Sequence, residues 1–203
     1  MKLAFTTLLL PLLAAAAPAP TATTQPAATS TPTPNPSFRV LALRSASQIH
    51  YFRMTARENK IWLGNQTEAF CPENVQPCPP GKETIFAPGG TAMDVAVPGG
   101  QQVYVDPTGA LRYTQAHSAA IPPGSARGPF TYQTHPGNTA NHFYNFTGWG
   151  ANGFMACPAK NSQWQVFANV QNATVPLGDR KACLPFHALA DPYKGAAAAW
   201  QYS

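Results

Sequence analysis

Charged side chains are scarce in this sequence. Only 10% of the 203 residues are Asp, Glu, Lys or Arg, and eight of these are acidic. The 13 basic residues are scattered, and the nearest thing to a patch is Arg39, Arg44, Arg53 and Arg57. Nucleic-acid binding needs a denser basic stripe with interleaved aromatics. Composition and charge therefore argue against a nucleic-acid partner.

The sequence also lacks the local motifs of hydrolytic enzymes. It has no G-x-S-x-G elbow, and Ser118 follows His117 without the strand–turn–helix context that activates a serine. A glycosidase needs two carboxylates about 5–9 Å apart across a cleft. The spacing of the acidic residues along the sequence does not indicate such a pair. The acids lie mostly in turns or beside prolines: Glu58, Glu68, Glu73, Glu83, Asp94, Asp106, Asp179 and Asp191. We therefore predict no catalytic residues, no cofactor and no enzymatic activity, with an extracellular hydrolase as the least favoured alternative.

Long apolar runs are absent beyond the first residues. The chain begins MKLAFTTLLLPLLAAAAPAP, in which Lys2 precedes a short apolar stretch and three alanines supply a small-residue cleavage pattern. This order is typical of a secretory signal peptide, which we place at residues 1–16. No other window approaches the roughly 18 apolar residues of a membrane span, and GAAAAWQYS (195–203) is too short and polar for a GPI signal. We predict secretion without a membrane anchor.

Residues 17–37 consist almost wholly of Ala, Pro, Thr, Ser and Gln and carry no charge. Such a composition cannot bury enough apolar surface to offset the entropy of ordering, so it predicts a disordered linker. Ser and Thr interleaved with Pro are also typical of O-glycosylated stalks, and a plain spacer and a stalk both fit. The folded domain is predicted to span residues 38–203, which is long enough for a hydrophobic core.

The chain has only four cysteines, Cys71, Cys78, Cys157 and Cys183. In an oxidising compartment they indicate two disulfides, for which three pairings exist. We favour Cys71–Cys78 and Cys157–Cys183, because cysteines close along the chain meet most easily. A zinc site would need C-x2-C spacing or a histidine near a cysteine, and a redox site would need C-x-x-C opening a helix. Neither pattern occurs, and the prolines of FCPENVQPCPP (70–80) forbid that helix.

Two histidines are the other candidates for a metal site. His135 and His142 lie in the segment THPGNTANHFYNF (134–146), whose Gly/Asn-rich composition predicts a loop. Loop histidines without nearby ligand partners face solvent far more often than they bind metal. We therefore predict no metal site.

The pattern of residue types over 38–203 predicts an all-β domain. Short runs rich in Val, Tyr, Phe, Trp and Thr are broken by Gly, Pro, Asn or Asp, and no long stretch has a helical repeat. Residues 106–109, DPTG, place Pro and Gly as a type I hairpin turn requires. The predicted strands are FRVLALR (38–44), IHYFRM (49–54), KIWLG (60–64), AMDVAV (92–97), QQVYV (101–105), ALRYTQ (110–115), NGFMAC (152–157) and WQVFANV (164–170).

Three strand–turn–strand units recur along the chain. Aligned on Ile61, Leu111 and Trp164, they are spaced by 50 and 53 residues. Three hairpin units of this size favour a β-trefoil-like threefold barrel, whereas a β-sandwich, the alternative fold, predicts no such period.

Three asparagines and one aromatic segment are candidate surface features. Asn65, Asn145 and Asn172 each begin an N-glycosylation acceptor pattern, of which we expect one or two to be used, with Asn172 the most exposed. The segment YNFTGW (144–149) is the best candidate for an exposed sugar-stacking platform, although most strand aromatics are expected in the core.

Several segments together resemble one protein family. They are CPENVQPCPPGKET (71–84), PGGQQVYVDPTGALRYTQAHSAAIPPGS (98–125), GFMACP (153–158), WQVFANVQNATVP (164–176), CLPFHALA (183–190) and WQYS (200–203). Over residues 38–203 the chain is similar to the fungal PhiA-type cell wall proteins, small secreted proteins associated with the phialides that bud off asexual spores. Some members are IgE-binding antigens. The resemblance implies an extracellular or cell wall location, a framework role for the cysteines and no catalytic residues to carry over.

The preferred hypothesis is a secreted, glycosylated cell wall protein with a structural or developmental role in phialide and conidium formation. Its expected partner is cell wall polysaccharide or another wall component. The alternative is a secreted carbohydrate-binding (lectin-like) or antagonistic effector module, which a threefold β fold with exposed aromatics would permit.

Overall fold

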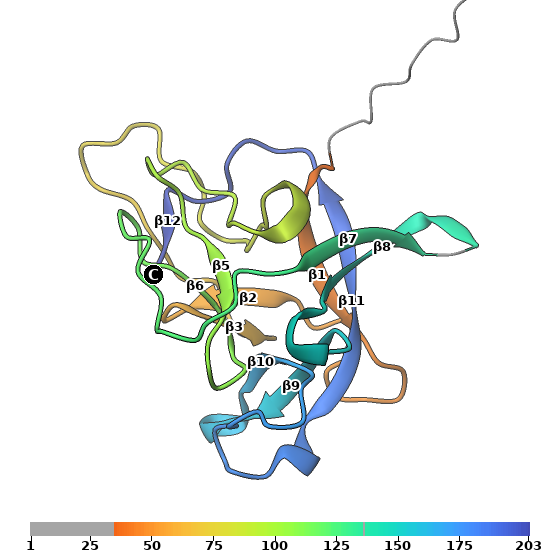
Figure 1. The fold of residues 1–203 in the computed structure, drawn as a ribbon. Helices are drawn as coiled ribbons and strands as arrows, with labels where there is room; N and C mark the ends of the chain where they lie inside the picture. Colours follow the sequence, from red (N-terminus) through yellow and green to blue (C-terminus); the bar gives the residue numbers. More distant parts are fainter. Residues whose placement is uncertain (1–34, 136) are drawn as a thin grey trace, which may run out of the picture. The chain divides into compact units, whose positions relative to one another are not determined.

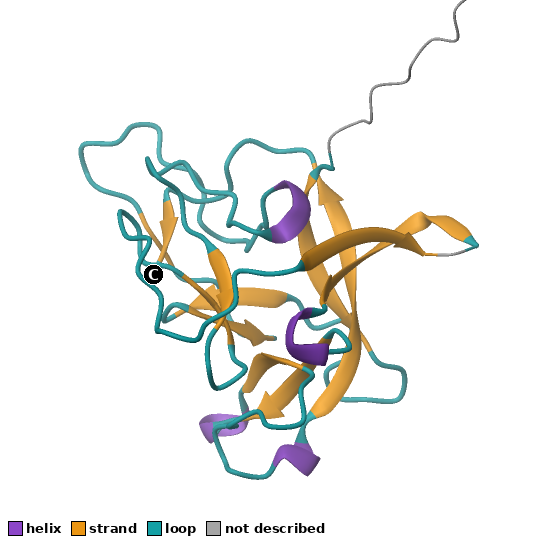
Figure 2. Cartoon of the chain, in the orientation of Figure 1, coloured by secondary structure: helices purple, strands orange, loops and turns teal. Residues whose placement is uncertain are grey.

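The computed structural model describes residues 35–135 and 137–203. The predicted signal peptide, 1–16, and most of the predicted linker, 17–37, lie outside these residues, and the first described strand begins at Ser37. Figure 2 shows strands and loops with four short 3-10 turns, which confirms the all-β class. No helix among the described residues is long and apolar enough to cross a membrane.

The strands are β1 (Ser37–Leu43), β2 (Met54–Arg57), β3 (Lys60–Leu63), β4 (Ala69–Phe70), β5 (Val103–Val105), β6 (Leu111–Tyr113), β7 (Phe130–His135), β8 (Asn138–Phe146), β9 (Phe154–Pro158), β10 (Trp164–Ala168), β11 (Leu184–Tyr193) and β12 (Gln201–Tyr202). The 3-10 turns are η1 (Pro88–Gly90), η2 (Gly148–Gly150), η3 (Lys160–Ser162) and η4 (Arg180–Ala182).

One antiparallel sheet contains ten of these strands and curls back on itself. Its order is β5-β6-β3-β10-β9-β11-β8-β7, with β1 beside β11 and β2 beside β3. An isolated bridge between Leu41 and Arg53 closes a ring of β1, β11, β9, β10, β3 and β2 (Figure 1). At this closure Ala42 N donates to Phe52 O at 2.9 Å, and Tyr51 N donates to Ala42 O at 2.8 Å. Residues 51–53 are therefore held against β1.

All three predicted hairpins are present. They are β2–β3, β5–β6 and β9–β10, and their second strands lie next to one another in the order β6-β3-β10. The trefoil itself is not confirmed, because β11, β8 and β7 continue the sheet beyond the hairpins with no counterpart in a threefold repeat.

The predicted strand at 49–54 is wrong. Residues 48–51 form a turn, in which Tyr51 has the left-handed φ of 62° and exposes its ring. The strand on this side begins only at Met54. A run that alternates like a strand is thus bent into a turn that carries an exposed aromatic.

An aromatic cluster fills the space between β1, β8 and η1. The Tyr144 ring lies 5.3 Å from the Phe38 ring and 5.2 Å from the Phe86 ring, measured between centroids, and its hydroxyl donates to Gly90 O at 2.7 Å. Gly90 has a φ of +75°, and a Cβ there would lie 2.2 Å from the Tyr144 ring, so only glycine fits. Burial raises the pKa of Tyr144 well above its ordinary value, because the charged form would be desolvated.

Tyr202 ties the last strand, β12, into the core. The fully buried Gln101 accepts from Tyr202 N at 2.7 Å through Oε1 and donates to Tyr202 O at 2.9 Å through Nε2. The Tyr202 hydroxyl accepts from Ile85 N at 3.0 Å and donates to Glu83 O at 2.8 Å. Desolvation raises the pKa of Tyr202, so this hydroxyl stays protonated and keeps both hydrogen bonds.

Both disulfides have the pairing that chain proximity favoured. Cys71–Cys78 closes a surface loop directly after β4. Cys157–Cys183 joins β9 to the segment before β11, and both of its cysteines are buried beside Met155. The two bonds thus differ in setting, one at the surface and one in a secondary core.

Candidate functional site

A groove of about 590 Å³ opens where β1 and β2 meet at the ring closure. Its lining residues are Arg39, residues 51–55, residues 64–67 and residues 81–84, and we call it the β1–β2 groove. Four segments that are distant in the sequence therefore meet in one concave surface. Concave sites with a few converging polar groups are the usual form of ligand pockets.

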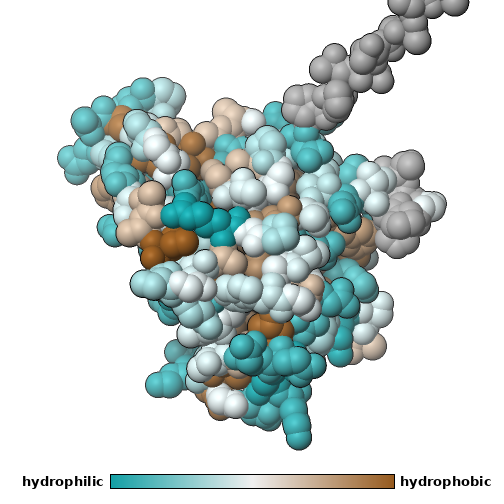
Figure 3. Space-filling view, in the orientation of Figure 1, coloured by the Kyte–Doolittle hydropathy of each residue, from teal (hydrophilic) through white to brown (hydrophobic). Residues whose placement is uncertain are grey.

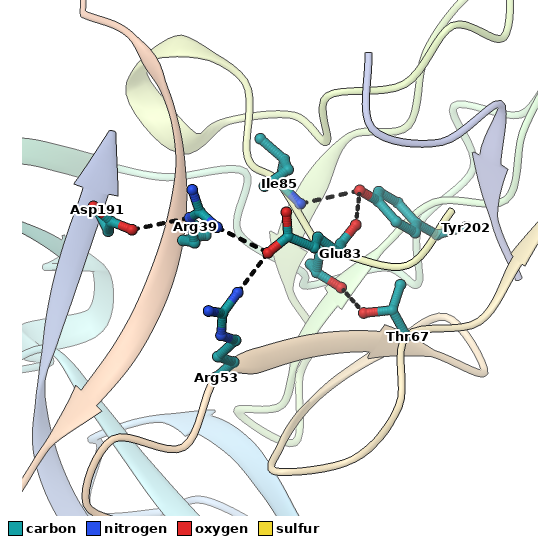
Figure 4. A network of polar contacts seen from close by, with 8 residues as sticks. Arg39, Arg53, Thr67, Glu83, Ile85, Asp191 and Tyr202 are labelled. Carbon is teal, nitrogen blue, oxygen red and sulfur yellow. Dashed lines mark hydrogen bonds and ion pairs between the residues drawn. The ribbon is translucent and has the colours of Figure 1, made fainter. Parts of the chain in front are cut away.

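Glu83 is the centre of the charged side of the groove. Its Oε1 accepts from Arg39 Nη1 at 2.8 Å and from Arg53 Nη1 at 2.5 Å, as Figure 4 shows. Arg39 also forms an ion pair with Asp191, at 2.9 Å between Nε and Oδ2. The backbone of Glu83 is anchored by the Tyr202 hydroxyl. The carboxylate is thus held from two sides before any ligand arrives.

Two exposed aromatics, Tyr51 and Phe52, also line the groove. The exposed fractions are 62% for Tyr51 and 37% for Phe52. The Tyr51 ring lies 4.0 Å from the His50 ring, and the Phe52 ring packs on Gly64, where a Cβ would come within 2.7 Å of it. Non-glycine residues with a left-handed φ, such as Tyr51, are uncommon and gather at functional sites.

Polar side chains complete the groove. Thr67 Oγ1 lies 2.8 Å from Thr84 Oγ1, and Ala56 N donates to Thr84 Oγ1 at 2.7 Å. Asn65 Nδ2 is buried and has no hydrogen-bond partner among the described residues. The hydroxyl contact holds Thr67 against Thr84.

The groove lining is rich in hydrogen-bonding groups and has a single carboxylate. Glu83 is the one carboxylate among its lining residues, whereas a glycosidase needs two. Elsewhere in residues 35–135 and 137–203, no group of three or more His, Cys, Asp or Glu side chains lies close enough to hold a metal ion. The His142 ring stacks on the Tyr132 ring, with 4.9 Å between the two ring centroids. The side chains that line the groove supply hydrogen-bonding groups and aromatic ring faces.

The aromatic platform expected at 144–149 has one exposed ring. Tyr144 and Phe146 are fully buried, whereas Trp149 is 49% exposed and borders a separate pocket with Asn172. Figure 3 shows small separate brown areas on the face it presents. The large hydrophobic residues that are exposed in the described part of the chain are Tyr51, Phe52, Phe70, Trp149 and Leu177. Two of the five are neighbours in the groove.

The three glycosylation candidates have different settings. Asn172 is exposed in a turn, Asn145 is half-buried on β8, and Asn65 lies in the groove with its Nδ2 buried. An N-glycan is attached through Nδ2, and this atom of Asn65 is buried in the folded groove, so a glycan there would require the side chain to move. Asn172 is the most exposed of the three, as the sequence predicted, whereas the burial of Asn65 Nδ2 was not predicted.

We expect glycan on Asn172 and none on Asn65. Glycopeptide mass spectrometry of the protein secreted by a fungal host, with and without enzymatic glycan release, measures the occupancy of each site. Asn172→Gln should remove most of the carbohydrate and leave the melting temperature within about 2 °C, since exposed substitutions change stability little. Full occupancy at Asn65 would contradict the geometry of the groove.

Comparison with known proteins shows which family the chain belongs to. It is 51% identical over 153 residues, covering 74% of this chain and 77% of the relative, to an uncharacterized secreted protein of Arthroderma benhamiae. No solved structure matches it. The family described as PhiA-like secreted protein matches residues 38–203, the same range over which the sequence resembles PhiA-type proteins. The chain therefore belongs to the PhiA-like family of secreted proteins.

Proposed function

We propose that this protein is a non-catalytic component of the fungal cell wall that acts in phialide and conidium formation and binds wall polysaccharide in the β1–β2 groove. The observation that carries the proposal is one carboxylate, fixed by two arginines, in the same groove as two exposed aromatics. Membership of a secreted family and a secreted fungal relative support the extracellular part. The resemblance to PhiA-type proteins supports the developmental part.

Sugars present hydroxyls at their edges and apolar C–H surface on their ring faces. Each hydroxyl both donates and accepts, which suits a carboxylate beside a guanidinium. The apolar face suits an aromatic ring, which offers a large surface at low conformational cost. The groove lining provides both kinds of contact, at Glu83 and at Tyr51.

Fractionation of the producing fungus tests this proposal. We expect the protein in the washed cell wall fraction of sporulating cultures and a reduced number of conidia in a deletion strain. Normal sporulation together with absence from the wall would contradict the proposal. Recovery from the medium alone would instead support a free lectin-like or antagonistic module acting outside the producing cell.

A further inference from the structure

We infer that the β1–β2 groove recognises a neutral pyranose through two adjacent hydroxyls, held between Glu83 and Arg53, with a ring face against Tyr51. The inference rests on the proposed function, because it names the ligand chemistry of the same groove. It follows from the unused hydrogen-bonding groups, the charge balance and the rigidity of this site.

Glu83 supplies the acceptor. Its Oε1 is occupied by Arg39 and Arg53, whereas Oε2 has no hydrogen-bond or ion-pair partner among the described residues. The side chain is 38% exposed, so this second oxygen is available to a ligand hydroxyl. A carboxylate acceptor makes hydrogen bonds roughly twice as strong as neutral ones.

Arg53 supplies the donor next to it. Its Nη1 binds Glu83, and its Nε and Nη2 have no partner among the described residues, on a side chain that is 53% exposed. Acceptor and donor thus stand side by side, joined by their own ion pair. Two adjacent sugar hydroxyls match this pair, because one donates to the carboxylate and the other accepts from the guanidinium.

The charge balance favours a neutral ligand. Arg53 and Arg39 are already compensated by Glu83, and Arg39 also by Asp191. An anionic group placed on Arg53 would lie beside the Glu83 carboxylate, and like charges in contact repel. Lys82 leaves one uncompensated positive charge at the rim, which is why an anionic polymer belongs in the test.

The aromatic side is held in place. Residues 51 and 52 are hydrogen-bonded to Ala42 across the ring closure, and Gly64 backs the Phe52 ring. A surface fixed before binding loses little entropy when a ligand arrives, which matters for weak protein–sugar contacts.

The requirement for two adjacent free hydroxyls distinguishes wall polysaccharides by their linkage. Mannans linked through positions 1,6 or 1,2 keep adjacent free hydroxyls on every residue. Residues inside a 1,3-linked glucan have none, because the linked oxygen separates the free hydroxyls. Periodate cleaves the bond between adjacent hydroxyl-bearing carbons, so it removes this feature from mannan and spares the interior of the glucan.

Affinity electrophoresis of the full secreted chain in gels containing yeast mannan, laminarin (a 1,3-glucan) or dextran sulfate is the experiment. We expect retardation by mannan above laminarin and dextran sulfate, and its loss with periodate-treated mannan. Glu83→Gln and Tyr51→Ala should each weaken mannan binding about tenfold, the effect of losing one charge-assisted contact or one stacked ring. Matched controls outside the groove, Glu73→Gln and Phe70→Ala, should bind as the parent does.

The outcomes separate this inference from the proposed function. Mannan binding that survives both Glu83→Gln and Tyr51→Ala, or persists after periodate, overturns the inference, as does stronger binding to dextran sulfate or no binding to mannan. The presence or absence of the protein in the washed cell wall fraction then tests the proposed function independently. Tyr51→Ala is informative even if Glu83→Gln fails to fold, because Tyr51 is exposed and outside the ion pairs.

Discussion

Tyr202→Ala is expected to lower the free energy of unfolding by about 3–5 kcal/mol, the usual cost of truncating a buried aromatic to alanine. The ring is 1% exposed and contacts the Tyr113 ring edge-on, at 6.2 Å between centroids. The loss of its hydroxyl leaves Ile85 N, a buried donor, without its partner. Against a typical stability of about 5–15 kcal/mol, this single change removes a large share.

Urea unfolding followed by tryptophan fluorescence measures the effect. Tyr202→Phe keeps the ring and removes only the hydroxyl, so it should cost about 1–3 kcal/mol, the penalty for an unsatisfied buried group. Tyr51→Ala, at an exposed tyrosine, serves as the control and should stay within about 0.5 kcal/mol of the parent. Equal losses for Tyr202→Ala and Tyr51→Ala would show that β12 does not anchor the fold.

Removal of the Cys157–Cys183 disulfide is the second large effect. The loop-entropy model gives about 3.5 kcal/mol for a bond that joins cysteines 26 residues apart. The double variant Cys157→Ala/Cys183→Ala also leaves space in the secondary core around Met155 and Phe167. The equivalent change at Cys71 and Cys78, which are seven apart, should cost about 2.5 kcal/mol.

Urea unfolding of the two double variants, without reductant, compares them directly. The buried pair should show the larger fall in midpoint, and both variants should keep the far-UV spectrum of a β protein. A larger loss from the surface pair would mean that the loop at 71–78 organises the fold more than its burial indicates.

The hairpins were predictable because their signals are local. In β5–β6, for example, Asp106 accepts from Thr108 N at 2.9 Å and from Ala110 N at 3.2 Å, which fixes the turn that the DPTG sequence indicated. β11 was missed because Pro185 and Pro192 interrupt its sequence, and prolines usually exclude a central strand. β7 and β8 were missed because their Gly/Asn-rich connection reads as a loop.

Almost no local pattern in the sequence indicated the groove. Arg39 and Arg53 were noted only as members of a loose basic group, and the structure separates that group. Arg44 donates to Pro185 O at 2.8 Å, and Arg57 pairs with Glu58 and Glu68, both outside the groove. Glu83 reaches the two arginines only because the ring closes between β1 and β2, and no spacing rule for a linear sequence encodes such a closure.

The pairing of β1 with β11 has a consequence for biosynthesis. The register joins Ser37 to Tyr193 and Leu43 to His187, and roughly 140 residues separate the end of one strand from the start of the other. At 5–20 residues per second, the ribosome needs roughly 7–30 s to deliver the partner strand. During that interval the run SFRVLAL lacks the strand with which it pairs in the finished sheet. The pairing of β1 with β11 therefore forms only after nearly the whole domain has been synthesised.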